Sequence, residues 1–521
     1  MRPRADVSSS IFILLLIGAS PASAAIFVWD GGGDGKTFED PLNWTADSGF
    51  PDSNIDDAQI DNAAAQASGT IVMSTTHLVR DVRLAPGVTL SVGSSDISIT
   101  RDLIVTNLGN GLAKISGTGR VVIALGTAAI QVADTANDRL EVDVLEVNDA
   151  GVGNVLTLKN GSRVRVMDQF LYTSASNLLL EANVVFAVPG ITIPLGETLT
   201  TQGCTLELSG PFRLDGAWSR NAADLFLVTS YANATTSIDL GTNPTILEAV
   251  EVQSGATLSP NVDIEIRGGL TVRSGGSLQG GTRTVTFPNS NTVTVEATGT
   301  CRFNHVNVNN VTTLAAGSNI AATGTLNVSG TLTANGATAN VITIDGGTFG
   351  GGGIFNQGVS KVVYGGSTPT MPTTARTFYD LEIAATGSTS AGASYTVQND
   401  WIATTSNFNA GTFTVTFDDS AVAATADYVG TQKTTFNAVV VAGAGTVWTL
   451  DTGDQVRVST LTVNATSRLS LSGSPILEVG TSLTVNGSFT ATGQTPILRD
   501  TGTDFTCTVA GGAGTTFDVD R

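Results

Sequence analysis

From residue 25 onward, the sequence consists of short apolar or alternating runs separated by turn-forming residues. Each run spans four to seven residues and is closed by glycine, asparagine, aspartate or serine, as in VLTLKNGSRVRVM and GTLNVSGTLTANG. Alternation of apolar and polar residues is typical of β-strands with one buried face. After residue 25, no long window keeps the 3.6-residue periodicity of an amphipathic helix. The sequence therefore predicts an all-β protein.

The composition narrows the classes of partner. Charged residues make up 13% of the chain, about half the usual share, and glycine is abundant at 59 of 521 residues. The formal net charge is −20. Such a surface repels nucleic acid and anionic membranes, so neither is expected as a partner. Extracellular glycan and protein surfaces are the expected classes of partner.

The first residues have the pattern of an export signal. Arg2 and Arg4 give a basic start, residues 11–17 form an apolar run, and residues 22–24 give an A-x-A site. We predict a signal peptide over residues 1–24, with cleavage after Ala24. A membrane anchor is the alternative, but the apolar run is too short to span a bilayer, and no later run reaches the roughly 18 apolar residues required. The sequence thus predicts a secreted, extracellular or cell-surface protein with no membrane span after cleavage.

The second half of the chain repeats a two-part pattern. An apolar run ends in an aromatic or Leu-Arg, and a T-F or similar pair opens an alternating run 14 to 19 residues later. The four copies are marked by Phe287 and Phe303, Tyr364 and Phe378, Phe417 and Phe436, and Leu498 and Phe517. Their uneven spacing disfavours a propeller or an immunoglobulin array and favours a solenoid, in which insertions form outward loops. Coils of about 20 to 25 residues, stacked about 4.8 Å apart, predict roughly 20 coils and a rod on the order of 100 Å long. The fourth copy stops in mid-repeat, so we expect either a fragment of a longer protein or the product of a truncated gene model.

Residues 25–66 differ from the rest in being rich in aspartate, glycine and aromatic residues. Asp30, Asp34, Asp56 and Asp57 lie in segments that are expected to form turns. Carboxylates in such loops are ligands that calcium prefers. Their spacing matches neither the EF-hand loop nor the calcium-binding nonapeptide repeat. The leading interpretation is that aspartate and glycine simply form turns, with tryptophans packing as a cap over the first coil, and that no cofactor is bound. The alternative is a structural calcium site, which is the one candidate cofactor that the sequence offers.

The stretch VWDGGGDGKTFEDPLNW resembles the W-x-GGG…NW…P N-terminal module of bacterial secreted and surface β-helix proteins. The repeats TVTF…TTFNAVVV and GTLNVSGTLTANG are similar to adhesin-like and autotransporter-passenger stalks. This resemblance implies a right-handed parallel β-helix outside the cell and implies no particular ligand. We therefore expect a cap over residues 25–66, irregular coils over 67–284, and coils with four TF-x-x-L/V-x-V type repeats over 285–521.

Residues suited to catalysis are sparse. The chain has two histidines, His77 and His305, and neither lies in a nucleophile motif. The carboxylate sets of residues 141 and 143, and of 263 and 265 with Arg267, have the spacing of one strand face, about 6 to 7 Å. That distance suits glycoside hydrolysis, but alternating polar residues on a solvated face give the same spacing. We predict no catalytic residue.

The three cysteines, Cys204, Cys301 and Cys507, lie about 100 and 200 residues apart. This odd and sparse set predicts small buried residues rather than a disulfide framework. With no enzyme expected, the leading prediction is an adhesin-like scaffold. The alternatives are a polysaccharide-binding or -cleaving protein of the pectin-lyase-like β-helix type, and a passive stalk for a missing C-terminal domain.

Overall fold

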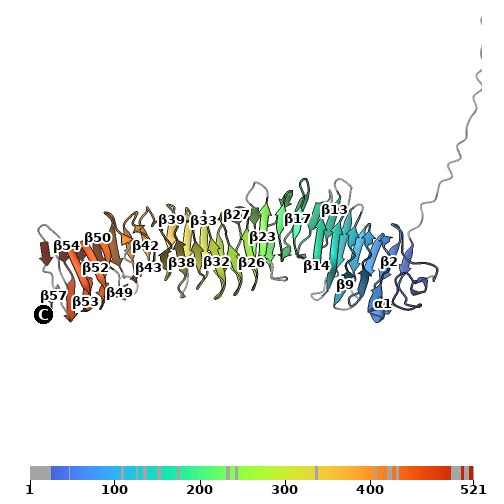
Figure 1. Cartoon of the computed structure of the whole chain (residues 1–521), viewed down its shortest axis with the longest axis horizontal. Helices are drawn as coiled ribbons and strands as arrows, with labels where there is room; N and C mark the ends of the chain where they lie inside the picture. Colours follow the sequence, from blue (N-terminus) through green and yellow to red (C-terminus); the bar gives the residue numbers. More distant parts are fainter. Residues whose placement is uncertain are drawn as a thin grey trace, which may run out of the picture.

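The protein is a long rod of stacked β-strands (Figure 1). The computed structural model describes residues 25–45, 47–106, 111–124, 127–132, 138–148, 154–172, 177–229, 235–240, 245–334, 338–404, 408–418, 425–429, 433–493, 506–509 and 516–519. The predicted signal peptide lies outside these residues. The described chain forms a parallel β-helix of about 18 turns with almost no helix, which confirms the predicted fold class. At about 4.8 Å per turn, the rod is on the order of 90 Å long.

Two sheets form the N-terminal part of the rod. Sheet 1 has nine strands: β1 (Ile26–Val28), β2 (Asp57–Ile60), β5 (Asp81–Leu84), β8 (Asp102–Val105), β11 (Ala128–Val132), β13 (Val155–Leu158), β15 (Asn177–Leu180), β18 (Thr198–Thr201) and β21 (Ala217–Ser219). Sheet 2 has 17 strands and extends to the middle of the rod: β3 (Thr70–Val72), β4 (His77–Val79), β6 (Thr89–Gly93), β7 (Ile97–Ile99), β9 (Leu112–Gly117), β10 (Val121–Ile123), β12 (Arg139–Val147), β14 (Arg163–Tyr172), β16 (Val185–Val188), β19 (Thr205–Leu208), β22 (Leu225–Val228), β25 (Ala249–Val252), β28 (Leu270–Val272), β31 (Asn291–Val295), β34 (Val311–Leu314), β37 (Thr331–Ala334) and β40 (Ile354–Asn356).

Three further sheets form the rest of the rod. Sheet 3 has 16 strands: β17 (Ile191–Ile193), β20 (Phe212–Leu214), β23 (Thr235–Leu240), β26 (Thr257–Pro260), β29 (Ser277–Gln279), β32 (Thr300–Phe303), β35 (Ile320–Ala322), β38 (Val341–Asp345), β41 (Lys361–Gly365), β43 (Asp380–Ile383), β46 (Trp401–Ala403), β49 (Thr425–Val429), β51 (Val447–Leu450), β53 (Arg468–Gly473), β55 (Ser488–Gly493) and β57 (Thr516–Val519). Sheet 4 has six strands: β24 (Thr245–Leu247), β27 (Ile264–Ile266), β30 (Thr284–Phe287), β33 (His305–Val308), β36 (Thr325–Val328) and β39 (Thr348–Gly350). Sheet 5 has nine strands: β42 (Arg376–Phe378), β44 (Thr389–Ser390), β45 (Tyr395–Val397), β47 (Phe408–Asn409), β48 (Thr414–Asp418), β50 (Thr434–Ala442), β52 (Gln455–Val463), β54 (Ile476–Val485) and β56 (Thr506–Val509).

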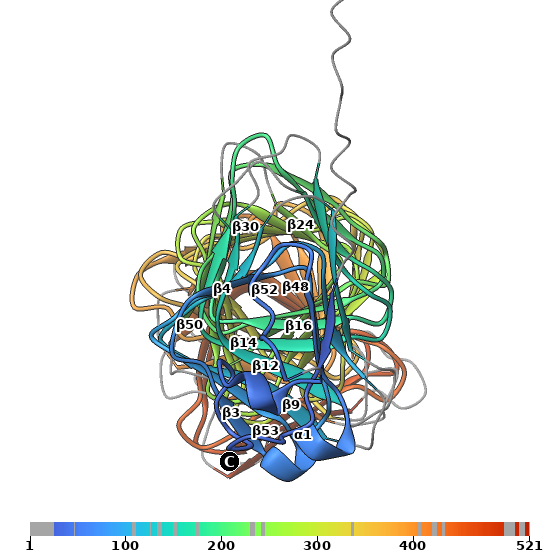
Figure 2. The same cartoon turned by 90° about the vertical axis from the view of Figure 1, so that its right-hand side faces the viewer.

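The cross-section of the rod changes along its length. Sheets 1 and 2 wind around the first coils, sheets 2, 3 and 4 around the middle coils, and sheets 3 and 5 around the last coils. Sheet 3 begins at β17, before sheet 1 ends at β21, so the change occurs within one or two turns. The view along the rod shows the strands wound around a shared interior (Figure 2).

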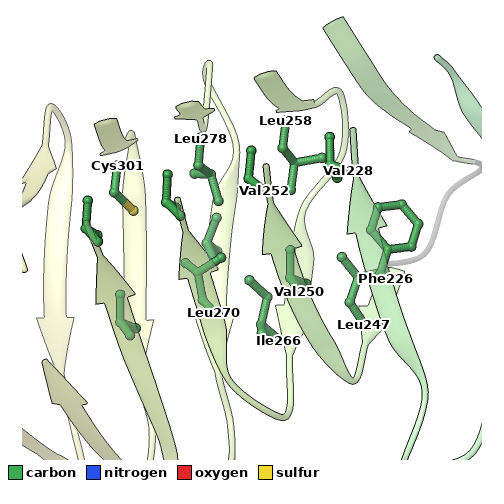
Figure 3. Close-up of a cluster of buried hydrophobic side chains, with 14 of the residues drawn as sticks. Phe226, Val228, Leu247, Val250, Val252, Leu258, Ile266, Leu270, Leu278 and Cys301 are labelled. Atoms are coloured by element: carbon green, nitrogen blue, oxygen red, sulfur yellow. The ribbon is translucent and has the colours of Figure 1, made fainter. Parts of the chain in front are cut away.

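The interior is filled by columns of apolar side chains from successive coils. In sheet 2, Phe226, Val250, Leu270 and Val293 are neighbours in the parallel register, and all four are buried. Figure 3 shows the first three of them on successive coils. One core cluster runs from Trp29 to Ala491. Each fully buried leucine or valine contributes about 1.5 to 3 kcal/mol, so the stacked coils share one continuous source of stability.

A small cap closes the N-terminal end of the core. It contains the 3₁₀ turn η1 (Pro41–Asn43) and the helix α1 (Ala63–Ser68), which is the only α-helix in the described ranges. Trp44 is fully buried there and meets the rings of Trp29 and Phe38 edge to face at 5.1 and 5.0 Å. The described helices include none with the length and apolar character to cross a bilayer.

Equivalent positions of the predicted repeats lie on different sheets in different copies. In the first copy, Phe287 ends a strand of sheet 4 and Phe303 ends one of sheet 3, whereas in the second copy Tyr364 belongs to sheet 3 and Phe378 to sheet 5. The periodic unit of the fold is therefore the single coil. Leu498 of the fourth copy lies outside the described residues.

Candidate functional site

Asp34, one of the predicted calcium ligands, is surrounded by hydrogen-bond donors of the cap. Its carboxylate accepts from the backbone amides of Lys36 and Thr37, both at 2.8 Å, and from the side-chain amide of Asn43 at 2.7 Å. The hydroxyl of Thr37 also donates to it. These bonds, that of the hydroxyl foremost, hold the pKa of Asp34 well below its usual range. The carboxylate therefore stabilises the loop that precedes η1, because four hydrogen bonds converge on it.

The structure does not bring the four predicted aspartates together. Asp30 accepts from the amide two residues ahead at 3.0 Å, and Asp56 accepts from the amide four residues before it at 3.3 Å. Asp57 begins β2 in sheet 1 and accepts two hydrogen bonds from Arg80. Across the described ranges, no three His, Cys, Asp or Glu side chains are grouped so as to hold a metal ion. Calcium binding by these residues stays a prediction.

A buried histidine links two carboxylates in the cap. The Nε2 atom of His77 lies 3.1 Å from Oε1 of Glu39, and its Nδ1 atom lies 3.0 Å from Oδ1 of Asp52. Thr75 lies 3.1 Å from Nε2, which gives a hydroxyl–imidazole–carboxylate series. Glu39 and Asp52 belong to the cap and His77 begins β4, so this cluster holds the cap against sheet 2. Sequence spacing gave no signal for it, because its members lie up to 38 positions apart.

The first carboxylate pair, Glu141 and Asp143, is engaged in ion pairs. Glu141 lies 3.3 Å from Arg139, and Asp143 lies 3.6 Å from Lys114. The register of β12 with β14 is irregular between Val142 and Val144, so Asp143 lies at a break in the strand face. The two carboxylates are therefore held by different cations.

The second carboxylate set, Asp263 and Glu265, lies at β27 and forms contacts that stabilise the stacked coils. Asp263 accepts from the backbone amide of Thr284 on the next coil at 2.8 Å, and Glu265 lies 3.7 Å from Arg267. Each carboxylate thus has a partner that stabilises the coil.

The cysteines and the second histidine have structural surroundings. Cys204 and Cys301 are buried free thiols, and burial raises the pKa of Cys204 to about 12. The side chain of Cys507 lies outside the described residues. His305 accepts a hydrogen bond from the backbone amide of Thr325 on the next coil at 3.1 Å. The thiol of Cys204 therefore stays protonated near neutral pH and is a poor nucleophile.

Sheet 5 presents two columns of hydroxyl side chains on its outer face. Each column residue meets its counterpart one coil away in the parallel register, and in the first column each lies between two buried residues. These hydroxyl columns consist of Thr377, Thr396, Thr416, Val440, Thr462 and Thr484, and of Ser394, Thr414, Ala438, Thr460 and Ser482. Column neighbours are about 4.8 Å apart, and the two columns are roughly 6.6 Å apart.

Sheet 2 carries a hollow that we name the arginine hollow. Its volume is about 180 Å³, and its lining includes Arg139, Arg163, Arg165, Val185, Ala187 and Glu207. The three arginines come from two neighbouring coils, β12 and β14. Sequence reasoning missed them. The R-x-R pattern of residues 163 and 165 was a visible signal, but its alignment with Arg139 depends on the register.

Comparison of the chain with protein-family models, with curated proteins and with solved structures found no match.

Proposed function

We propose that this protein is a secreted or cell-surface scaffold of the adhesin-like type, with no catalytic activity. The hydroxyl columns of sheet 5 are the observation that carries the proposal. Nearly every position in them bears a hydroxyl, and the same group recurs coil after coil along a straight face. In Figure 1, the strands β50, β52 and β54 of this sheet lie in the orange-to-red end of the rod.

A repeated array of weak donors and acceptors suits multivalent attachment. A single threonine hydroxyl contributes little net binding free energy, because it exchanges water for the partner. Many identical groups on one stiff rod engage a surface together, and each further contact is formed at a high effective concentration. The rod also supplies reach, since its one core keeps successive coils in line.

Two sequence features support the extracellular part of the proposal. The pattern of residues 1–24 predicts export, and the net charge of −20 suits a protein that stays soluble outside the cell. The carboxylate sets support a structural role rather than catalysis, because each is bound to an arginine, a lysine or a backbone amide of its own coils.

Adhesion of the exported protein tests the proposal. The full chain is produced in a bacterial host, where we expect it outside the cytoplasm with Ala25 as its first residue. Beads coated with it are then held under flow on glycan-coated and protein-coated glass. We expect the double variant Thr416→Glu/Thr462→Glu to lose most of the retention, because it places charges in the middle of a hydroxyl column.

The matched control changes the outward threonines of sheet 3, Thr343→Glu/Thr449→Glu, and should keep the retention. Equal loss in both variants, or an unprocessed protein confined to the cytoplasm, would overturn the proposal. Release of reducing ends from polysaccharides by the purified chain would contradict its non-catalytic part and favour the pectin-lyase-like alternative.

A further inference from the structure

Two arginines lie side by side on the outer face of sheet 2. The parallel register pairs Leu140 of β12 with Val164 of β14, so the residues before them, Arg139 and Arg163, are neighbours on adjacent coils. Like charges directly opposite each other destabilise a sheet. In a chain with 45 acidic and 25 basic residues, such a pair is a local reversal of the overall charge.

Carboxylates compensate these arginines only in part. Arg139 has Glu141 at 3.3 Å, and Arg165 reaches Glu207, two coils further along, at 3.6 Å. Within the described ranges, no carboxylate lies within ion-pair distance of Arg163, whose side chain is exposed at the rim of the hollow. The hollow thus presents a guanidinium for which the described residues supply no carboxylate at ion-pair distance.

The shape of the hollow explains why a ligand fits there. The register places Ala187 beside Arg165, where a longer side chain would fill the space between the arginines and Glu207. A second, smaller depression continues past Arg165 and Ala187 to Ser209 and Thr229 on later coils. The two depressions therefore run across successive coils along the rod, and the lining of the second includes the hydroxyl-bearing residues Ser209 and Thr229.

We infer that the arginine hollow binds an acidic polysaccharide built of uronic acid residues. A guanidinium binds a carboxylate with two parallel hydrogen bonds. A uronic acid carboxylate would therefore supply the negative partner for Arg163. Further along, Glu207 would accept hydrogen bonds from sugar hydroxyls, and Ser209 and Thr229 would accept or donate them. The inference deepens the proposed function, on which it rests, by naming the class of extracellular partner.

Binding of the full-length protein to polygalacturonate, measured by titration calorimetry at low and high salt, tests the inference. We expect binding to polygalacturonate, no binding to neutral dextran, and weaker binding as salt screens the ion pairs. Arg163→Gln should lose most of the binding. The matched control is Arg273→Gln, which removes the same charge from an exposed arginine of the same face that is paired with Glu251 and Glu296.

Thermal melting separates loss of the site from loss of the fold. Arg163→Gln should melt no lower than the parent, because it relieves the repulsion with Arg139, whereas Arg273→Gln should melt lower. No binding by the parent chain, equal binding to dextran, or equal loss in both variants would overturn the inference. Bead retention that survives Arg163→Gln, while polygalacturonate fails to bind, would leave the proposed function intact and remove this site alone.

Discussion

The guanidinium of Arg80 donates to both carboxylate oxygens of Asp57, from Nε to Oδ1 at 2.8 Å and from Nη2 to Oδ2 at 2.5 Å. One coil later Arg101 binds Asp81 in the same way, and Asp57 and Asp81 are neighbours in the register of sheet 1. Like carboxylates stacked on one another are thus each neutralised by an arginine from the following turn. In the arginine hollow, by contrast, the described residues supply no such partner for Arg163.

Removing a carboxylate from this series should destabilise the first coils. Asp81 is almost fully buried and also accepts from the backbone amide of Asp102 at 3.1 Å. We expect Asp81→Ala to cost about 2 kcal/mol, the range of a hydrogen bond to a charged group. Because a solenoid opens coil by coil, hydrogen exchange of the amides of residues 82–84 is the local measurement.

The exposed pair of Arg213 and Asp215 provides the comparison for Asp81→Ala. Asp215→Ala should cost under about 1 kcal/mol, since solvent screens such a pair. Similar losses in the two variants would show that burial of Asp81 contributes nothing.

The cap should open in acid because of Glu39. Burial raises the pKa of this carboxyl, whereas hydrogen bonds from His77 and from the amides of Ser74 and Thr75 lower it. The hydrogen bonds together outweigh the burial, so the pKa of Glu39 lies below its usual value. A group with a lowered folded pKa stabilises the protein above its unfolded pKa, about 4.3, and loses that contribution as the pH falls through the folded pKa.

We therefore expect hydrogen exchange over residues 74–79 to rise, relative to the Glu39→Gln variant, as the pH falls below about 4. The variant serves as the control because it cannot titrate at that position. A constant difference between the two proteins from pH 7 to pH 3 would contradict the role of Glu39.

Alternation within a strand could be predicted from the sequence, because residues i and i+2 share a face. Phe417 points inward and Thr416 outward, as their pattern indicates. Contacts between coils could not be predicted, because coil length varies. The step from Thr377 to its neighbour Thr396 is 19 positions, whereas that from Leu140 to Val164 is 24. A shift of one residue would exchange the inward and outward faces.

The acidic candidate site illustrates the same limit. The four aspartates of the cap lie close together in sequence, so proximity suggested one site. The loop around Asp34 instead closes on Asn43, and Asp57 enters sheet 1 beside Asp81 on the next coil. Partners that come from other coils or from backbone amides have no signature in the spacing of the aspartates.

Thermal melting in the presence of a chelator tests whether the cap binds calcium. Asp30, Asp34, Asp56 and Asp57 each already accept hydrogen bonds from amides or from Arg80. We therefore expect the melting temperature to be the same with EDTA and with added calcium. A lower melting temperature in EDTA, restored by calcium but not by magnesium, would instead establish calcium as a ligand of the cap.

Two buried tryptophans should respond differently to the same substitution. The indole N–H of Trp44 donates to the carbonyl of Phe38 at 2.7 Å, whereas the described residues offer no acceptor to that of Trp401. Trp401 packs edge to face against Phe408 and Phe436 at 4.8 and 4.9 Å, and phenylalanine keeps much of that contact. A buried donor without a partner carries a desolvation cost of about 1 to 3 kcal/mol, and Trp401→Phe removes it.

Trp401→Phe should therefore lower stability less than Trp44→Phe, which leaves a buried carbonyl without its donor as well as a smaller ring. Thermal melting of both variants, with hydrogen exchange over residues 38–45 and 401–403 to locate the change, measures the difference. Trp401→Ala should be costly, at about 3 to 5 kcal/mol, because it opens a cavity between two aromatic rings. If Trp401→Phe were as destabilising as Trp401→Ala, the indole nitrogen of Trp401 would have to be hydrogen-bonded in solution.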